Sequence, residues 1–241
     1  MSMRAFTPEG VEPQPGATIE LDDDESHYLV KVRRARIGDA LELLDGRGGA
    51  WVATLRSAGR RAQVEVGAAL QITEPPTRVV LLGLPDQPAT LEALTGASEL
   101  GATHVVLVAC ERSQGRTPSA ARLQRILRAS QRQCGRVRPL ELIGGPPDDP
   151  LPLARALELH EDLPGVFAWE TLRDVDSEIG STAGGLRLLV GPEGGLTAPE
   201  VQVLRNANFR AVSLGPYVLR TPTAVIAILA RFLAPTQPAV D

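Results

Sequence analysis

The amino-acid sequence predicts two domains, a small N-terminal β-barrel domain and a larger C-terminal α/β domain with a mostly parallel sheet. Up to about residue 72, short and partly alternating apolar segments are separated by glycine-containing turns, a pattern typical of a small barrel. Residues 73–77 then hold two adjacent prolines, which favour a linker. Beyond the linker, continuous apolar runs alternate with helical segments, as in parallel sheets buried on both faces. We therefore place the domains at residues 1–72 and 77–241.

Within the N-terminal domain the pattern predicts three strands and one short helix. The strands are expected at residues 40–45, 50–55 and 62–66, where apolar side chains partly alternate with polar ones. A helix is expected to open near Asp23 to Ser26, whose polar side chains suit a helix start, and to run through Arg33.

The C-terminal domain is predicted to alternate strands and helices throughout. Residues 78–84, Arg-Val-Val-Leu-Leu-Gly-Leu, form an apolar run typical of a strand buried on both faces. The remaining strands are expected at 105–109, 165–169, 186–190 and 211–214, and the helices at 89–101, 119–134, 199–206 and 223–233.

Composition excludes several classes of protein. Hydrophobic residues make up 43% and charged residues 22%, which is ordinary for a globular protein. No apolar run approaches the ~18 residues of a membrane span, and the first residues lack a secretory signal. The two cysteines, Cys110 and Cys134, provide neither a disulfide framework nor a metal-like spacing. We therefore expect a cytoplasmic protein with no membrane contact and no metal site.

Basic residues are concentrated in two blocks although the net charge is −4. Residues 27–61 hold eight lysines and arginines against three acids, and residues 111–138 hold eight arginines against one acid. Such blocks favour local contact with nucleic-acid phosphates, because each neutralised phosphate releases a counterion. Solvated helix faces that carry arginines are the alternative interpretation of each block.

The strongest chemical signal is the segment Leu188-Leu-Val-Gly-Pro-Glu-Gly-Gly195. A buried strand runs into a glycine-rich turn, and Thr197 then suits the N-cap of a helix. Loops at the carboxyl ends of strands are where α/β sheets bind ligands. The loop lacks the lysine of a phosphate-binding P-loop, so it is either another ligand loop or a plain tight turn.

A second strand-to-helix turn lies at residues 214–224 and carries Arg220 between apolar neighbours. The chain turns at Gly215-Pro216, and an apolar helix is expected from Thr223. A charge at this position indicates either a functional residue or a structural role in capping or ion pairing.

Together these loops and several shorter elements resemble the bacterial 16S ribosomal RNA (uracil-N3)-methyltransferase family, of the RsmE type, within the SPOUT class. The resemblance covers nearly the whole chain. Its elements, in order, are Arg4-Ala-Phe6, residues 27–34, Gly38-Asp39, Asp45-Gly46, residues 97–101, Glu111-Arg-Ser113, Gln133-Cys-Gly-Arg136, residues 191–195 and residues 219–224.

The resemblance implies a PUA-like RNA-binding barrel followed by a SPOUT domain with a deep trefoil knot. It implies a homodimer that methylates N3 of one uridine near the 3′ end of 16S rRNA in the small ribosomal subunit, with S-adenosylmethionine as donor. The implied cofactor-binding residues are Val190, Gly191, Pro192, Glu193, Gly194, Gly195, Leu214, Gly215, Val218, Leu219 and Thr221. The implied RNA-binding residues are Arg4, His27, Lys31, Arg33, Arg34, Arg112 and Arg136.

Arg220 is the expected catalytic residue. Uracil N3 must lose its proton, and the negative charge that develops on the ring requires stabilisation. Arginine is a poor base because its pKa exceeds ~12, so we assign Arg220 to orientation and anion stabilisation.

The chain departs from the family pattern in three places. Pro222 and Arg132 stand where the family usually has glutamates, and residues 85–88 replace a common lysine. Two alternatives therefore stay open, a non-catalytic RNA-binding or ribosome-assembly protein on the same scaffold and a knotted methyltransferase that acts on a different RNA. A P-loop hydrolase is disfavoured because no lysine or Walker aspartate accompanies the glycine loop.

Overall fold

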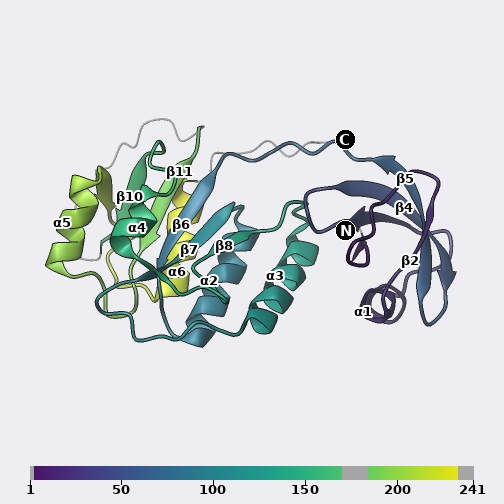
Figure 1. Ribbon diagram of the computed structural model, residues 1–241, viewed down its shortest axis with the longest axis horizontal. Coiled ribbons are helices and arrows are strands. Elements are labelled where there is room, and N and C mark those ends of the chain that lie inside the picture. Colours follow the sequence, from purple (N-terminus) through teal and green to yellow (C-terminus); the bar gives the residue numbers. More distant parts are fainter. Residues whose placement is uncertain (1–2, 170–183, 233–241) are drawn as a thin grey trace. The chain divides into compact units, whose positions relative to one another are not determined.

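The computed structural model describes residues 3–169 and 184–232, and the chain forms two compact units (Figure 1). The first unit consists of Met1–Glu74 together with Gln131–Pro139. The second consists of Pro75–Ser130 and Leu140–Asp241. The first unit is therefore assembled from two separate stretches of the sequence.

The first unit contains a five-stranded sheet with the strand order β1-β3-β4-β5-β2. Figure 1 shows that this sheet is curled. Inward residues such as Leu43, Leu55 and Val64 are fully buried, which explains the partly alternating pattern of the sequence. The three predicted strands are confirmed, whereas β1 and β2 are three residues long and too short to show a pattern. The strands are β1 (Arg4–Phe6), β2 (Thr18–Glu20), β3 (Ala40–Leu44), β4 (Ala50–Ala58) and β5 (Ala62–Ala69).

The predicted short helix is present as two consecutive pieces. Helix α1 (Asp23–His27) begins after Asp22, whose side chain accepts a 2.8 Å hydrogen bond from the N–H of Glu25. A single turn of π-helix (Tyr28–Val32) follows directly. This wider turn places Leu29 in the core of the unit and leaves Lys31 exposed.

A buried ion pair joins the two stretches of the first unit. The carboxylate of Glu25, with 2% of its side chain exposed, accepts hydrogen bonds from the Arg132 guanidinium and from the Phe6 N–H at 3.1 Å. The Arg132 guanidinium also lies 4.3 Å from the ring centre of Tyr28. Arg132, which departs from the family pattern, is thus the partner of a buried acid.

The second unit is built on a parallel sheet with the order β12-β10-β11-β6-β7-β8, with β9 paired to β7. Every strand pair in it is parallel. The strands are β6 (Arg78–Gly83), β7 (His104–Ala109), β8 (Glu141–Ile143), β9 (Leu151–Pro152), β10 (Gly165–Ala168), β11 (Leu186–Val190) and β12 (Phe209–Val212).

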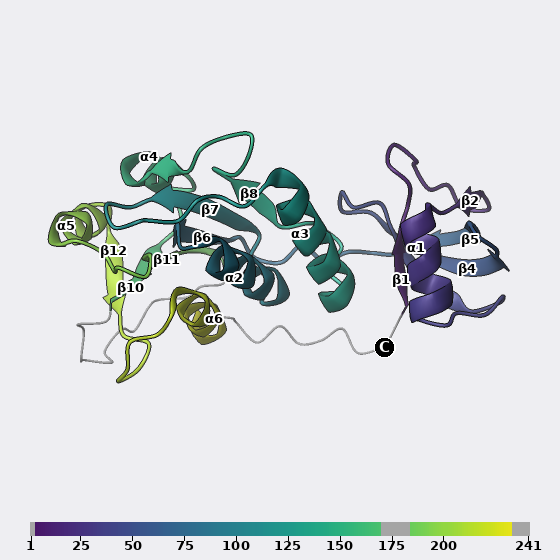
Figure 2. The same ribbon diagram turned by 90° about the horizontal axis from the view of Figure 1, so that it is seen from below.

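Helices cover both faces of this sheet (Figure 2). One face carries α2 (Gln87–Glu99), α3 (Ala120–Cys134) and α6 (Thr221–Phe232). The other carries α4 (Leu153–Glu158) and α5 (Ala198–Asn206).

The two-sided burial explains the continuous apolar strands of the sequence. In β6, Val80 and Leu82 belong to one hydrophobic cluster, whereas Val79 and Leu81 belong to the other. Because successive side chains point to opposite faces, both sets must be apolar.

The mostly parallel α/β sheet is thus confirmed, with small differences at the element ends. Strand β12 begins two residues before its predicted start, and α6 begins at Thr221 rather than at residue 223. Elements β8, β9 and α4 were not predicted because each is too short to display a period. The trefoil knot stays a prediction. Among the described helices, none is both long and apolar enough to cross a bilayer.

Two of the departures from the family pattern suit the helices that they begin. Pro222 lies in the first turn of α6, where a proline removes no intrahelical hydrogen bond. Residues 85–88 contain Asp86, which caps α2 by accepting a 2.8 Å hydrogen bond from the N–H of Ala89.

Candidate functional site

A pocket lies in the second unit at the carboxyl ends of β10, β11 and β12. These strands are neighbours in the sheet, so the loops that follow them meet at one edge. The pocket brings together all eleven residues predicted to bind the cofactor, Val190, Gly191, Pro192, Glu193, Gly194, Gly195, Leu214, Gly215, Val218, Leu219 and Thr221.

Close backbone packing shapes the glycine loop, residues 191–195. Gly195 has a φ of +71° and its N–H donates a 2.8 Å hydrogen bond to the carbonyl of Pro192, which closes the turn. A Cβ atom on Gly194 would lie only 2.9 Å from the Cβ of Arg112. The loop then enters α5 through a capping box between Thr197 and Glu200.

The second loop, residues 213–220, is joined to the glycine loop by a hydrogen bond. The Thr221 hydroxyl donates to the carbonyl of Gly191 at 3.3 Å. Thr221 is buried at the start of α6, so it links the helix end to the pocket wall. Gly215 has a φ of +134°, a conformation that favours glycine.

Arg220 lies in this loop between two residues that line the pocket, Leu219 and Thr221. Its carbonyl accepts a 2.9 Å hydrogen bond from the N–H of Ala224 and so begins α6. Its side chain is exposed, does not itself line the pocket, and makes no ion pair within residues 3–169 and 184–232. Within these described residues, the structure thus gives no support to a structural salt bridge at Arg220.

A third segment, Cys110 to Ser113, holds the glycine loop from the side of β7. The N–H of Glu111 donates to Glu200 Oε1 at 2.8 Å, and Arg112 Nη1 donates to the carbonyl of Gly194 at 2.9 Å. Arg112, predicted to bind RNA, therefore also supports the pocket.

The first residue of this segment is a buried thiol. Burial, together with the nearby Glu200 carboxylate, raises the pKa of Cys110 to about 12. The thiol is therefore neutral at physiological pH and acts as a small apolar side chain.

Sequence reasoning missed part of the pocket. Its remaining lining residues are Ala168, Trp169, Leu196, Tyr217 and Ala224. The strand that ends at Ala168 was predicted, but its place between β11 and β12 was not, and only that place brings Trp169 to the pocket. Gly83 was also missed. It lies beneath the glycine loop, where a Cβ atom would be 2.7 Å from Pro192 Cδ.

The residues predicted to bind RNA in the first unit do not form one site. His27 and Lys31 are exposed and line a groove with Arg60, and Arg33 and Arg34 follow them in the chain. The π-helical turn, Tyr28–Val32, thus contains Lys31, is preceded by His27 and is followed by Arg33 and Arg34.

Arg4 and Arg136 lie elsewhere in the same unit. Arg4 Nε pairs with Glu42 at 2.6 Å, and its guanidinium packs against Gly135. Arg136 Nε donates to the carbonyl of Arg138 at 2.8 Å, and burial lowers the pKa of Arg136. Both guanidinium groups thus have partners within the protein.

The fold and the pocket define a class of protein, and comparison with known families agrees. Residues 73–233 match the family described as RNA methyltransferase domain, and residues 21–66 match the RNA methyltransferase PUA domain. The chain is therefore an RNA methyltransferase with an N-terminal PUA domain.

Individual relatives narrow the class further. The chain is 32% identical to Ribosomal RNA small subunit methyltransferase E of Mycobacterium tuberculosis, over 90% of this chain and 86% of the relative. It is 30% identical to the protein of that name from Synechocystis, over 90% and 73% of the two chains. A crystal structure of the Neisseria gonorrhoeae protein of that name, bound to S-adenosylmethionine, is 28% identical, covers 96% of each chain and superposes with a TM-score of 0.79. The chain belongs to the ribosomal RNA small subunit methyltransferase E family.

Proposed function

We propose that this protein transfers a methyl group from S-adenosylmethionine to N3 of a uridine near the 3′ end of 16S rRNA, within the small ribosomal subunit of the cytoplasm. The observation that carries the proposal is the pocket, where both family loops meet at one edge of the sheet. The Neisseria gonorrhoeae relative was solved with S-adenosylmethionine bound, which supports the choice of donor.

The lining of the pocket fits this donor. Apolar side chains of Val190, Leu196, Leu214 and Leu219 suit the flat faces of an adenine ring, and the exposed backbone of the glycine loop suits its polar edge. S-adenosylmethionine, when bound, supplies a methyl group on an electrophilic sulfonium. The residues of the pocket therefore serve to hold and align donor and acceptor for an in-line displacement.

Arg220 is the residue that we assign to the acceptor side. Arg220 stands in the chain between two residues that line the pocket, and its exposed guanidinium is the group that we assign to donate to the oxygens of a uracil ring as N3 loses its proton. N3 lies on the Watson–Crick edge, so the target base must be unpaired or extruded before it reaches this position. Pro222 stands where the family usually has a glutamate, but the first turn of α6 is still formed and Arg220 is still present.

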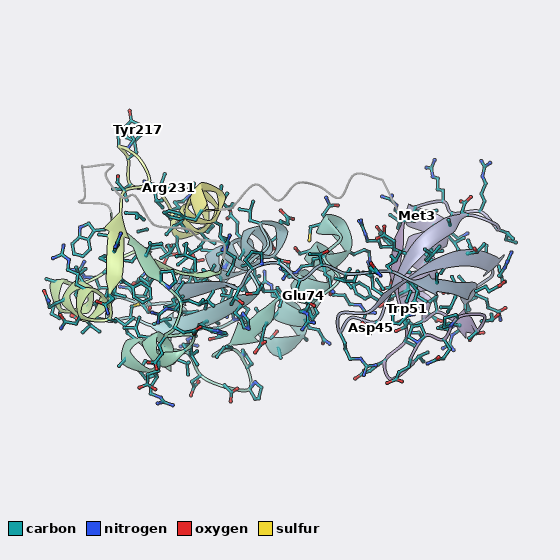
Figure 3. All side chains as sticks on the ribbon, turned by 90° about the horizontal axis from the view of Figure 1, so that it is seen from above. Met3, Asp45, Trp51, Glu74, Tyr217 and Arg231 are labelled. Carbon is teal, nitrogen blue, oxygen red and sulfur yellow. The ribbon has the colours of Figure 1, made fainter. Side chains whose placement is uncertain are left out.

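A second subunit is part of the proposal. Two large side chains at the rim of the pocket are highly exposed, Tyr217 at 82% and Val218 at 79%. Figure 3 shows Tyr217 at the tip of its loop, pointing away from the body of the unit. Exposed large apolar residues next to a functional pocket are typical of a surface that a partner covers. A homodimer that covers this rim would also exclude water from the reacting groups.

The decisive experiment is a methyl-transfer assay with labelled S-adenosylmethionine and small subunits from a strain that lacks this gene. We expect label as 3-methyluridine near the 3′ end of 16S rRNA. Arg220→Ala should reduce turnover by about 10²–10³-fold, as for loss of an anion-stabilising donor, with unchanged donor affinity. Arg155→Ala, on α4, is the matched control and should keep full activity.

Two other results would overturn the proposal. Donor binding without label in the RNA would indicate a non-catalytic RNA-binding protein. Label in another nucleoside or another RNA would indicate a different substrate on the same scaffold.

A further inference from the structure

Helix α3 carries a row of arginines on the face that points away from the sheet. Leu123, Ile126 and Leu127 pack into the core of the second unit. Arg122 and Arg125 are exposed and follow a spacing that places them on the opposite side of the helix. No aspartate or glutamate occurs between Arg112 and Leu140, so the helix supplies no acid of its own.

The arginines of the first basic block are different, because acids already neutralise several of them. Arg56 pairs with Glu65 at 2.6 Å, and Arg60 and Arg61 both pair with Asp23. Within the part of the chain that the structure describes, the guanidinium groups of Arg116, Arg122 and Arg125 lie near no such carboxylate. Like charges spaced three apart destabilise a helix slightly, so the fold itself gains nothing from this row.

The row begins at the same edge of the sheet as the pocket. Strand β7 ends at Ala109, and the next residues contact the glycine loop through Arg112. Arg116 follows in the connection to α3, which Gln87 holds through a 3.5 Å hydrogen bond from its Nε2 to the carbonyl of Thr117. Arg122 then lies in the first turn of α3, six residues after Arg116.

We propose that Arg116, Arg122 and Arg125, named here the α3 arginine face, bind the phosphate backbone of the RNA substrate. The inference rests on the proposed function and adds a surface on the second unit to which the RNA would dock. Guanidinium groups that pair with no described carboxylate, two on one face of α3 and one in the connection just before it, suit phosphates, which accept bidentate hydrogen bonds. Such contacts fix the position of the RNA and carry no base sequence.

The test compares Arg122→Gln, Arg125→Gln and the double variant with Arg155→Gln. Arg155 is an exposed helical arginine that already pairs with Glu158, so it controls for the loss of one charge. Binding of a fragment from the 3′ end of 16S rRNA and of whole small subunits is measured over a range of salt concentrations. Each substitution on α3 should lower the slope of log Kd against log salt by about 1, and the double variant should bind about tenfold or more weakly.

Two readouts keep this test separate from a folding defect and from the proposed function. The double variant should bind S-adenosylmethionine as the wild type does, and should keep its turnover at saturating RNA while KM rises. An unchanged salt slope in the double variant, while the wild type methylates 16S rRNA, would overturn the α3 arginine face alone. Absence of methylation by the wild type would instead overturn the proposed function. Weaker binding to subunits but not to protein-free RNA would assign the face to an acidic protein and would also overturn the inference.

Discussion

The pocket and the residues predicted to bind RNA differ in what builds them. The pocket comes mainly from two short stretches of backbone, and all eleven predicted residues line it. The seven RNA-binding predictions are scattered, and Arg4, Arg112 and Arg136 donate hydrogen bonds to groups of the protein itself. A site formed by the backbone of consecutive residues can be predicted from the local sequence. The role of a charged side chain cannot, because it depends on partners that are distant in the sequence.

The sequence separations make this difference concrete. Arg4 pairs with Glu42, 38 residues away, whereas Arg112 contacts Gly194 at a separation of 82 residues. No local pattern distinguishes such an arginine from one that awaits a ligand. A guanidinium without a partner in the protein, rather than the presence of an arginine in a basic block, is what indicates a free binding surface.

The largest effect should follow from breaking the buried pair of the first unit. Arg132→Leu leaves the Glu25 carboxylate buried without its cation, which should cost about 3–5 kcal/mol of stability. Urea unfolding followed by Trp51 fluorescence, in a Trp169→Phe background, reports on this unit. In the double variant Arg132→Leu/Glu25→Gln, most of the lost stability should be restored, because no buried charge is left without a partner. In all of these variants the affinity of the second unit for S-adenosylmethionine should stay unchanged. An unaltered Trp51 transition would contradict the assigned role of Arg132.

A smaller effect is expected at Gly83, which supports the pocket without lining it. Gly83→Ala places a Cβ atom against Pro192 and should weaken S-adenosylmethionine binding about tenfold, equivalent to about 1.4 kcal/mol. Isothermal titration calorimetry measures the affinity. Gly184→Ala, where the added atom meets open space, is the control. Equal affinities for both variants would show that the loop tolerates displacement.

Arg112 was predicted to bind RNA, but in the structure it supports the cofactor pocket, so a substitution there can distinguish the two roles. Arg112→Met removes its hydrogen bond to the Gly194 carbonyl and should weaken donor binding by about 1 kcal/mol, roughly fivefold. RNA binding, measured in parallel at fixed salt, should change less. The reverse result, weaker RNA binding with unchanged donor affinity, would return Arg112 to the role predicted from the sequence.

The smallest effect concerns the Cys110 thiol. Its pKa is raised from 9.0 to about 12, so the folded state holds the proton more tightly than the unfolded chain. The resulting stability is fully present below pH 9 and is lost as pH rises towards 12. At pH 9.5 the loss should be below about 1 kcal/mol. Stability measured from pH 8 to 10.5 should therefore fall more steeply in the wild type than in Cys110→Ala, and parallel curves would refute this role.

Much of the fold was predictable because apolar residues recur in its strands and helices with the pattern typical of each. The strand at β6 and the helix at α2 follow from continuous apolar runs and a clear helix end. Strand order was not predictable, since the place of β10 between β11 and β12 depends on packing rather than on local sequence. For the same reason Trp169 was missed as a pocket residue, although its strand was found.

The division of α3 between the two units has a consequence for synthesis on the ribosome. The stretch Gln131–Pro139, which supplies Arg132, belongs to the first unit although 56 intervening residues, Pro75–Ser130, belong to the second. Arg132 follows Glu25 by 107 residues. At about 5–20 residues per second, roughly 5–20 s therefore pass between the synthesis of Glu25 and that of its partner. A nascent chain that ends at residue 74 contains the residues of all five strands but not the cation that neutralises Glu25, so the order of translation couples completion of the first unit to synthesis of the second.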